Sequence, residues 1–150
     1  MSDWRKVKSA FLDGLLQAVE ASGGKYEEHP RLEVVQATWQ HDGSLPVLVM
    51  VAVGQVGWWG LYKNTYDRMV NAAAKEPRRT YAVVLLLSER RGYVLSAAFL
   101  RARQPGWIVY TDGHGYEQYK LVERQVAACP KFGSVAECAA LLAELASRPA

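Results

Sequence analysis

The chain has 150 residues, a formal net charge of +3 at pH 7, and 50% hydrophobic and 22% charged residues. This is the length of one ordinary domain with room for a core, so we expect residues 1–150 to form a single domain. The composition is average for a globular protein and excludes disorder as the overall state. No apolar stretch reaches the roughly 18 residues of a membrane helix, so we expect no membrane partner.

Cysteine usage and the first residues indicate the compartment. The opening residues, MSDWRKVKS, carry charges and no apolar core, so no secretion signal is predicted. Cys129 and Cys138 are nine residues apart, which suits neither a zinc site nor a disulfide framework. We therefore expect two buried thiols and a cytoplasmic protein.

Three segments have helical patterns. The first is capped by Ser2 or Asp3 and ends at Gly23–Gly24. Its apolar stripe is formed by Trp4, Val7, Phe11, Leu15 and Val19. Residues 61–75 form a second helix that ends before Pro77, and the S-x-x-E spacing of Ser134 and Glu137 begins a third.

The segments between these helices have strand patterns. Residues 32–39 alternate, the Asp-Gly turn at 41–44 predicts a hairpin, and residues 45–53 form an unbroken apolar run. Residues 81–87, 93–100 and 107–111 favour further strands, whereas 116–126 fits both periods. We expect an α+β fold with a mixed, mainly antiparallel sheet of about five strands and N-terminal, central and C-terminal helices packed on it.

The stretch from Val47 to Arg68 joins the central apolar run to the second helix through a glycine-punctuated segment. Two adjacent tryptophans in such a turn cannot easily both point inward, so at least one of Trp58 and Trp59 is expected to be exposed or to line a cleft. Tyr62 and Tyr66 are expected to pack the helix onto the sheet.

Basic residues are concentrated in one part of the chain. Residues 75–103 contain seven basic and two acidic residues, a local charge of +5. Aromatic faces stack on bases and arginines neutralise phosphates, so this pattern favours nucleic-acid binding. Solvated turns give the same pattern, and that alternative stays open. The predicted nucleic-acid-binding residues are Trp58, Trp59, Lys63, Arg68, Arg78, Arg79, Tyr81, Arg90 and Arg91.

Common catalytic patterns are missing from the sequence. There is no G-x-S-x-G motif, neither cysteine has a polar setting, and His29, His41 and His114 are scattered in turns. The G-x-x-G-x-x-G spacing of glycines 54, 57 and 60 matches neither the dinucleotide-binding fingerprint nor the P-loop. We therefore predict no catalytic residue, no metal and no cofactor.

The order helix, hairpin, strand, helix, strand is similar to the core of PD-(D/E)XK nucleases. That resemblance implies an acid at the end of one strand, and an acid and a lysine two apart on the next, to hold a divalent metal. Asp42 would be the first acid, but Met50 and Ala52 occupy the other two positions. A site of this kind is then degenerate or rebuilt elsewhere, for instance from Glu33 or Lys63.

A second resemblance rests on short segments in order along the chain. These are the first helix, Gly43-Ser-Leu-Pro-Val, Arg79-Thr-Tyr-Ala-Val-Val-Leu, Gly92-Tyr-Val-Leu-Ser and the closing helix. They resemble the N-terminal DNA-binding domain of McrB-type modification-dependent restriction proteins, which implies base flipping into a pocket that includes Tyr81 and Leu85. That family has a tryptophan where this chain has Val47.

Three functions follow from these patterns. The leading hypothesis is a non-catalytic DNA-binding module, with a restriction or defence system as its expected setting. The alternatives are a divergent PD-(D/E)XK-like nuclease and a small immunity or accessory protein that binds a protein partner or forms a homodimer.

Overall fold

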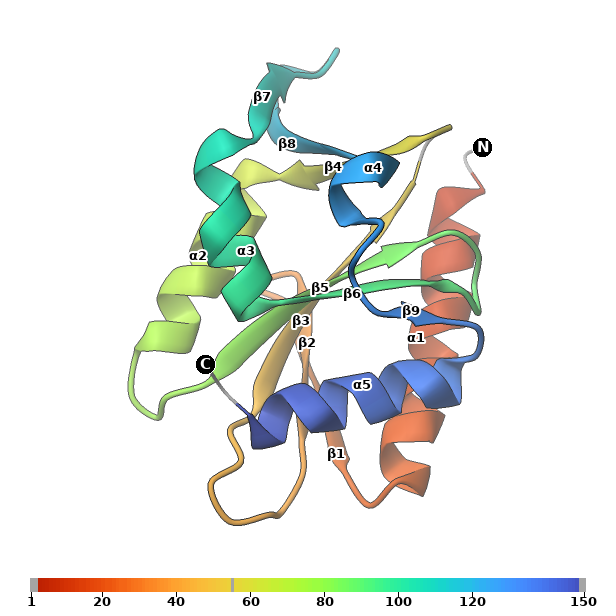
Figure 1. Ribbon diagram of the computed structural model, residues 1–150, viewed down its shortest axis with the longest axis vertical. Coiled ribbons are helices and arrows are strands. Elements are labelled where there is room, and N and C mark those ends of the chain that lie inside the picture. The colour runs from red at the N-terminus through yellow and green to blue at the C-terminus, as the bar shows by residue number, and fades with distance from the viewer. Residues whose placement is uncertain (1–2, 55, 149–150) are drawn as a thin grey trace.

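The main feature of the computed structural model, which describes residues 3–54 and 56–148, is a six-stranded mixed sheet (Figure 1). The strand order is β1-β2-β3-β5-β6-β9, and only the central β3–β5 pair is parallel. The strands are β1 (Lys25–His29), β2 (Val34–Thr38), β3 (Val47–Val53), β5 (Thr80–Leu86), β6 (Gly92–Ser96) and β9 (Lys131–Phe132). The α+β class and the mixed sheet predicted from the sequence are confirmed.

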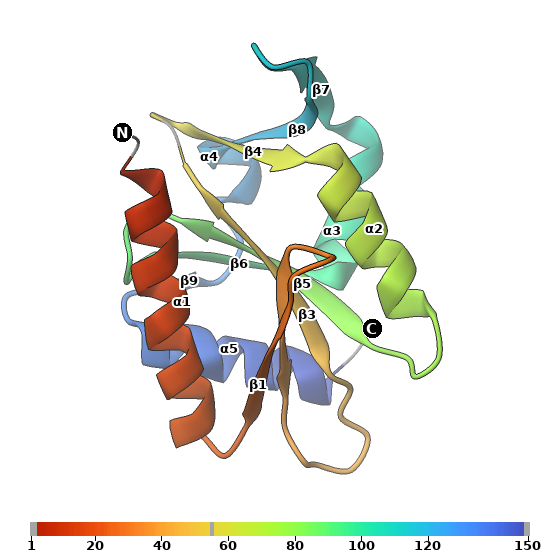
Figure 2. The same cartoon turned by 180° about the vertical axis from the view of Figure 1, so that it is seen from behind.

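Helices cover both faces of this sheet (Figures 1 and 2). On one face lie α1 (Trp4–Ala21) and α5 (Val135–Ser147), and on the other α2 (Lys63–Ala74) and α3 (Ala97–Arg103). The alternation of side chains along β3 explains why both faces are filled. Val49 belongs to the α1–α5 core and Met50 to the α2–α3 core, so a continuous apolar run is what a doubly covered strand requires. None of the described helices combines the length and apolar character needed to cross a membrane.

A second, three-stranded sheet lies near the C-terminal end of β3, from which the chain continues into its first strand. It contains β4 (Trp58–Tyr62), β8 (Glu117–Val122) and β7 (Ile108–Thr111), all antiparallel, in the order β4-β8-β7. Two short helices flank it in the chain, the 3-10 turn η1 (Gln104–Gly106) and α4 (Glu123–Val126). The buried side chains on its inner face, Trp59, Leu61 and Leu121, pack into the α2–α3 core. The two sheets therefore share one hydrophobic cluster.

The helix ends agree with the capping patterns. The Ser134 Oγ accepts the Glu137 N–H at 3.2 Å, and the Glu137 carboxylate accepts the Gly133 N–H at 3.1 Å. Asp3 is the N-cap of α1, although its side chain makes no capping bond; Ser2, the other predicted cap, lies outside the described residues. Gly23 has φ 85°, a left-handed conformation that suits glycine at a helix end.

The local structure differs from the prediction in two places, and one strand was not predicted. Residues 58–62, which were expected to form a turn and the start of a helix, form strand β4. Each of them pairs with a residue of β8, more than 50 residues later in the chain, so no local sequence pattern indicates this strand. The predicted strand 93–100 ends at Ser96, whose Oγ accepts the Phe99 N–H at 3.2 Å and begins α3. Strand β1 was not predicted, because its sequence, KYEEH, is polar and lies at the sheet edge.

Candidate functional site

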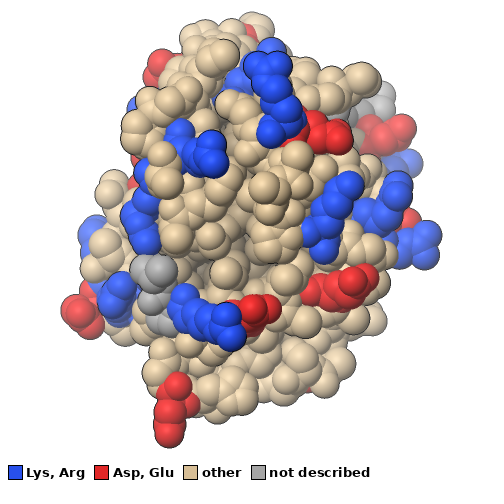
Figure 3. Space-filling model, viewed as in Figure 1, with Lys and Arg blue, Asp and Glu red and all other residues tan. Residues whose placement is uncertain are grey.

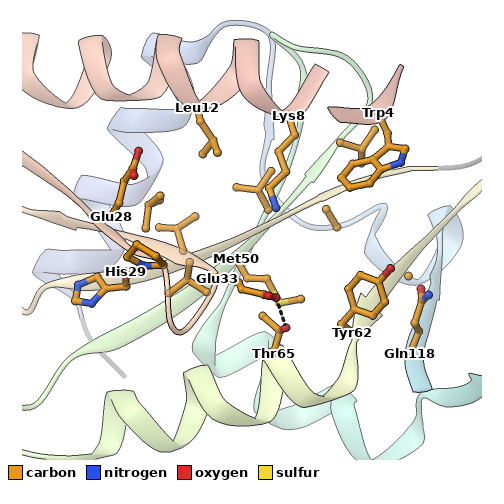
Figure 4. Close-up of a pocket in the computed structure, with 18 of the residues that line it drawn as sticks. Trp4, Lys8, Leu12, Glu28, His29, Glu33, Met50, Tyr62, Thr65 and Gln118 are labelled. Carbon is orange, nitrogen blue, oxygen red and sulfur yellow. Dashed lines mark hydrogen bonds between the residues drawn. The ribbon is translucent and has the colours of Figure 1, made fainter. Parts of the chain in front are cut away.

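A cleft of about 660 Å³ lies between the N-terminal half of α1 and the start of α2, over the edge of β3 (Figure 4). The turn between β1 and β2 closes one end, and β4 with its partner β8 closes the other. Its size is within the roughly 300–1,000 Å³ that small-molecule sites occupy. The polar and aromatic side chains that line it are Trp4, Lys8, Glu28, His29, Glu33, Trp58, Tyr62, Thr65, Tyr110 and Gln118.

The floor of the cleft is formed by the end of β3, which extends beyond its pairing with β2. The last paired residues are Val35 and Val49, and the Glu33 N–H donates to the Pro30 carbonyl instead of to β3. Residues 50–53 of β3 therefore have no strand partner on this side among the described residues, although all seven residues of β3 pair with β5 on the other. This part of β3 is a strand edge inside a cleft.

Glu33 has an unusual backbone at the start of β2. It is the one non-glycine residue with positive φ in the described part of the chain, at 58°. Its carboxylate accepts the Thr65 hydroxyl from α2 at 3.0 Å (Figure 4). A left-handed conformation is unfavourable for a residue with a Cβ, and such strain is concentrated at functional sites. Glu33 is therefore the first acidic candidate in the cleft.

Lys8 points from α1 into the cleft (Figure 4). Burial lowers the pKa of its ammonium group, and the negative charge of Glu33 raises it in part. A partly desolvated cation near a carboxylate interacts more strongly with an incoming anion than a surface lysine does, because water screens it less.

Aromatic side chains form the other end of the cleft. Figure 4 shows the Trp4 ring, from α1, and the Tyr62 ring, from β4, on opposite sides of this end, with Gln118 beside them. Both rings are substantially exposed, Trp4 at 40% and Tyr62 at 46%. Trp58 is half-buried and meets the edge of Tyr110 at 5.5 Å.

Hydrogen bonds fix the polar groups of this wall. The Tyr110 hydroxyl donates to Gln118 Oε1 at 3.1 Å, and Gln118 Nε2 donates to Asp112 at 2.8 Å. The ammonium group of Lys120 lies 5.0 Å from the centre of the Trp58 ring. One face of Trp58 is thus covered by a cation. The Arg5 guanidinium likewise lies 5.2 Å from the centre of the Trp4 ring, and Tyr62 meets the edge of Tyr116, although both Trp4 and Tyr62 keep a large exposed surface.

The predicted aromatic residues divide between core and cleft. Trp59 is 2% exposed, and its Nε1 donates to the Leu86 carbonyl at 3.0 Å. Tyr81 is 5% exposed and packs edge-on against Tyr66. Neither ring has a free face for stacking on a base. Trp58 does line the cleft, as was expected of at least one of the two tryptophans.

The predicted basic residues are not brought together. Arg78 and Arg79 precede β5, and Arg90 and Arg91 follow it, so the two pairs lie at opposite ends of one strand. Arg79 is used internally, because it donates to Gln36 at 3.2 Å and to the Ala72 carbonyl at 3.0 Å. The face shown in Figure 3 agrees: its Lys and Arg side chains are dispersed among acidic and uncharged residues.

Two more predicted cations have partners near the cleft but do not line it. Lys63 pairs with Asp67 at 3.1 Å, which raises the lysine pKa, and Arg68 donates to the Arg31 carbonyl. Of the two residues named for a rebuilt nuclease site, the cleft contains Glu33 and not Lys63. Asp42 follows β2 at the end opposite to the cleft and does not line it.

Lys8, Thr65 and Tyr62 were missed as site residues. Lys8 has the pattern of a polar helix residue, Thr65 that of an ordinary helix position, and Tyr62 was assigned to the core. No local pattern could have found them, because the cleft exists only where β2 separates from β3.

The described residues do not form the metal site that the nuclease core implies. They contain no group of three or more His, Cys, Asp or Glu residues able to hold a metal ion. The Glu33 carboxylate points toward Thr65, while Glu28 lies apart from it (Figure 4). On β3, Met50 and Ala52 supply no ligand.

No protein-family model matches the chain, and no curated protein sequence matches it. Among solved structures, the chain is similar to the 1.6 Å structure of Hjc, a Holliday junction resolvase from the archaeal hyperthermophile Archaeoglobus fulgidus. The TM-score is 0.57 at 13% identity, with 88% of this chain and 94% of the resolvase covered. This likeness shows the fold alone.

Hjc has the PD-(D/E)XK nuclease fold, so the likeness supports the PD-(D/E)XK-like core that was the second of the two resemblances. Nothing in these comparisons supports the McrB-type resemblance. The likeness is therefore one of architecture, and the cleft is the place on this fold where polar and aromatic side chains meet the strained backbone of Glu33.

Proposed function

We propose that the protein acts on DNA through this cleft, as a divergent protein of the PD-(D/E)XK nuclease fold. The observation that carries the proposal is the position of Lys8, a partly desolvated cation that points into a cleft with exposed aromatic rings. Cations bind phosphates and aromatic faces bind bases, so together they fit a nucleotide chain. The resolvase-like fold supports the same substrate class.

Fluorescence anisotropy with labelled DNA tests this proposal. The probes are a single strand, a duplex and a four-way junction, at low salt. Lys8→Gln should weaken binding, whereas Lys6→Gln, the same charge change on an exposed face of α1, should have little effect. Removal of one phosphate-binding cation should reduce the slope of log K against log salt by about 0.7–0.9. Absence of binding to all three probes, or equal effects of both variants, would refute the proposal.

Cleavage is a second candidate activity, favoured by the nuclease fold and by the strained backbone of Glu33. Incubation of plasmid DNA and of the junction with Mg²⁺ or Mn²⁺ tests it. Glu33→Gln should abolish cleavage, and Asp42→Asn, a carboxylate outside the cleft, should leave it unchanged. If the protein only binds, Glu33→Gln should preserve or strengthen binding, because it removes a negative charge next to Lys8.

A role in restriction or in defence against foreign DNA stays a prediction, as do a homodimer and a protein partner. The fold supports DNA as the partner without indicating the pathway. Comparison of methylated and unmethylated probes in the same anisotropy assay tests the link to modification.

A further inference from the structure

The edge of β3 inside the cleft offers main-chain groups that have no strand partner within residues 3–54 and 56–148. The Gly54 N–H donates to the Leu86 carbonyl of β5. Because main-chain groups of alternate residues point to the same neighbouring strand, those of Ala52 and Met50 also point toward β5. The N–H and C=O groups of Val51 and Val53 then point to the side that β2 has left.

These groups lie in a site with a specific chemistry. Val51 places one donor and one acceptor side by side, which is the pattern that the hydrogen-bonding edge of a nucleobase can match. The rings of Trp4 and Tyr62 lie on opposite sides of the same cleft (Figure 4). Lys8 projects from the same helix as Trp4, one turn further along, and supplies the positive charge for a phosphate.

The size of the cleft selects the form of DNA. About 660 Å³ suits one nucleotide with its nearest neighbours and is far too small for a turn of duplex. A base that is paired and stacked in a helix cannot reach the β3 edge. Only a base in a single strand, at an end or at a branch point presents its edge and both its faces.

We propose that the cleft binds one unpaired nucleobase of DNA. The base lies between Trp4 and Tyr62, its edge bonds to the free main-chain groups of Val51 and Val53, and Lys8 binds an adjacent phosphate. This inference rests on the proposed function and adds the form of DNA that the site selects.

The first experiment compares three oligonucleotides by anisotropy: a single strand, its duplex, and the same strand with a central run of abasic sites. Removing the bases retains the phosphates, so the abasic strand separates base contacts from charge. Stacking of one base on aromatic rings corresponds to a loss of about 5- to 150-fold in affinity. Equal binding of the abasic and the intact strand would overturn the inference.

The second experiment changes the rings. Trp4→Leu combined with Tyr62→Leu should remove the preference for the intact strand over the abasic strand. The matched control is Phe99→Leu, a half-buried ring on α3 with the Arg103 guanidinium 5.4 Å from its centre, outside the cleft. A preference retained by the double variant would refute the stacking geometry. Circular dichroism verifies that each variant is folded.

Hydrogen exchange of the wild-type chain tests the main-chain contacts without any substitution. The amides of Val51 and Val53 should exchange faster than those of Met50 and Ala52, and the single strand should slow them. Unchanged exchange at Val51 in the presence of saturating single strand would refute the edge contact. If none of the probes binds at all, the proposed function fails. If DNA binds, but the abasic strand and the duplex bind as well as the intact single strand does, only this inference fails.

Discussion

Replacement of Trp59 by alanine tests whether the tryptophan pair is divided between core and cleft as described. Trp59 is 2% exposed, packs edge-on against Tyr93 at 5.9 Å and donates to the Leu86 carbonyl. Truncation of a buried tryptophan costs about 3–5 kcal/mol in the free energy of unfolding. The Leu86 carbonyl also accepts the Gly54 N–H, at 3.3 Å, so it would keep a partner and the hydrogen bond adds little to that cost.

The matched control is Trp58→Ala. Trp58 is half-buried and its ring contacts are the edge of Tyr110 and the ammonium group of Lys120, so its loss should cost about 1 kcal/mol or less. For a chain of this length, each kcal/mol lowers the melting temperature by about 2–4 °C. We therefore expect Trp59→Ala to melt roughly 6–20 °C lower than wild type.

Urea unfolding followed by far-ultraviolet circular dichroism measures both variants without relying on tryptophan emission. An unchanged dependence on urea concentration would show that only stability has changed. If Trp58→Ala proves as costly as Trp59→Ala, or if Trp59→Ala costs less than about 1 kcal/mol, the assignment of Trp59 to the core is refuted.

Three further predictions concern backbone packing and titration. Gly92→Ala should destabilise strongly, because a Cβ would meet the backbone of β5, whereas Gly113→Ala has open space and should be nearly neutral by thermal melting. Burial, with two nearby carboxylates, raises the pKa of Tyr26 to about 12. The unfolded phenol ionises near pH 10, so stability should fall from pH 10 toward pH 12, and less in Tyr26→Phe. Burial raises the pKa of Cys138 to about 12, so a thiol reagent at pH 8 should modify Cys129 first and Cys138 only on unfolding.

The elements with a strong local pattern could be predicted from the sequence. The stripe of α1 contains Phe11, Leu15 and Val19, all fully buried, and the apolar runs became the parallel pair β3 and β5. Strand β4 could not be predicted, because it depends on pairing with the distant β8 and the glycines at 54, 57 and 60 indicate a turn.

The candidate site was harder to predict for the same reason. Lys8, Glu33 and Tyr62 come from three separate parts of the chain, and they meet only because β3 continues past its last pair with β2, which joins Val49 to Val35. The basic segment 75–103 shows the opposite case, in which residues predicted to form one surface lie apart. Its residues are close in sequence, but β5 extends between Arg79 and Arg90 and holds them apart. Proximity along a chain predicts a shared surface only when no strand lies in between.

The backbone of Glu33 has a consequence for the evolution of this protein. A left-handed conformation costs a residue with a Cβ about 1–2 kcal/mol, which glycine avoids and asparagine largely avoids. A library selected for thermal stability alone should therefore accumulate glycine or asparagine at this position, and the carboxylate in the cleft would be lost. A library selected for action on DNA should keep glutamate and accept a lower melting temperature. The residue recovered at position 33 would thus report which pressure the fold has been under.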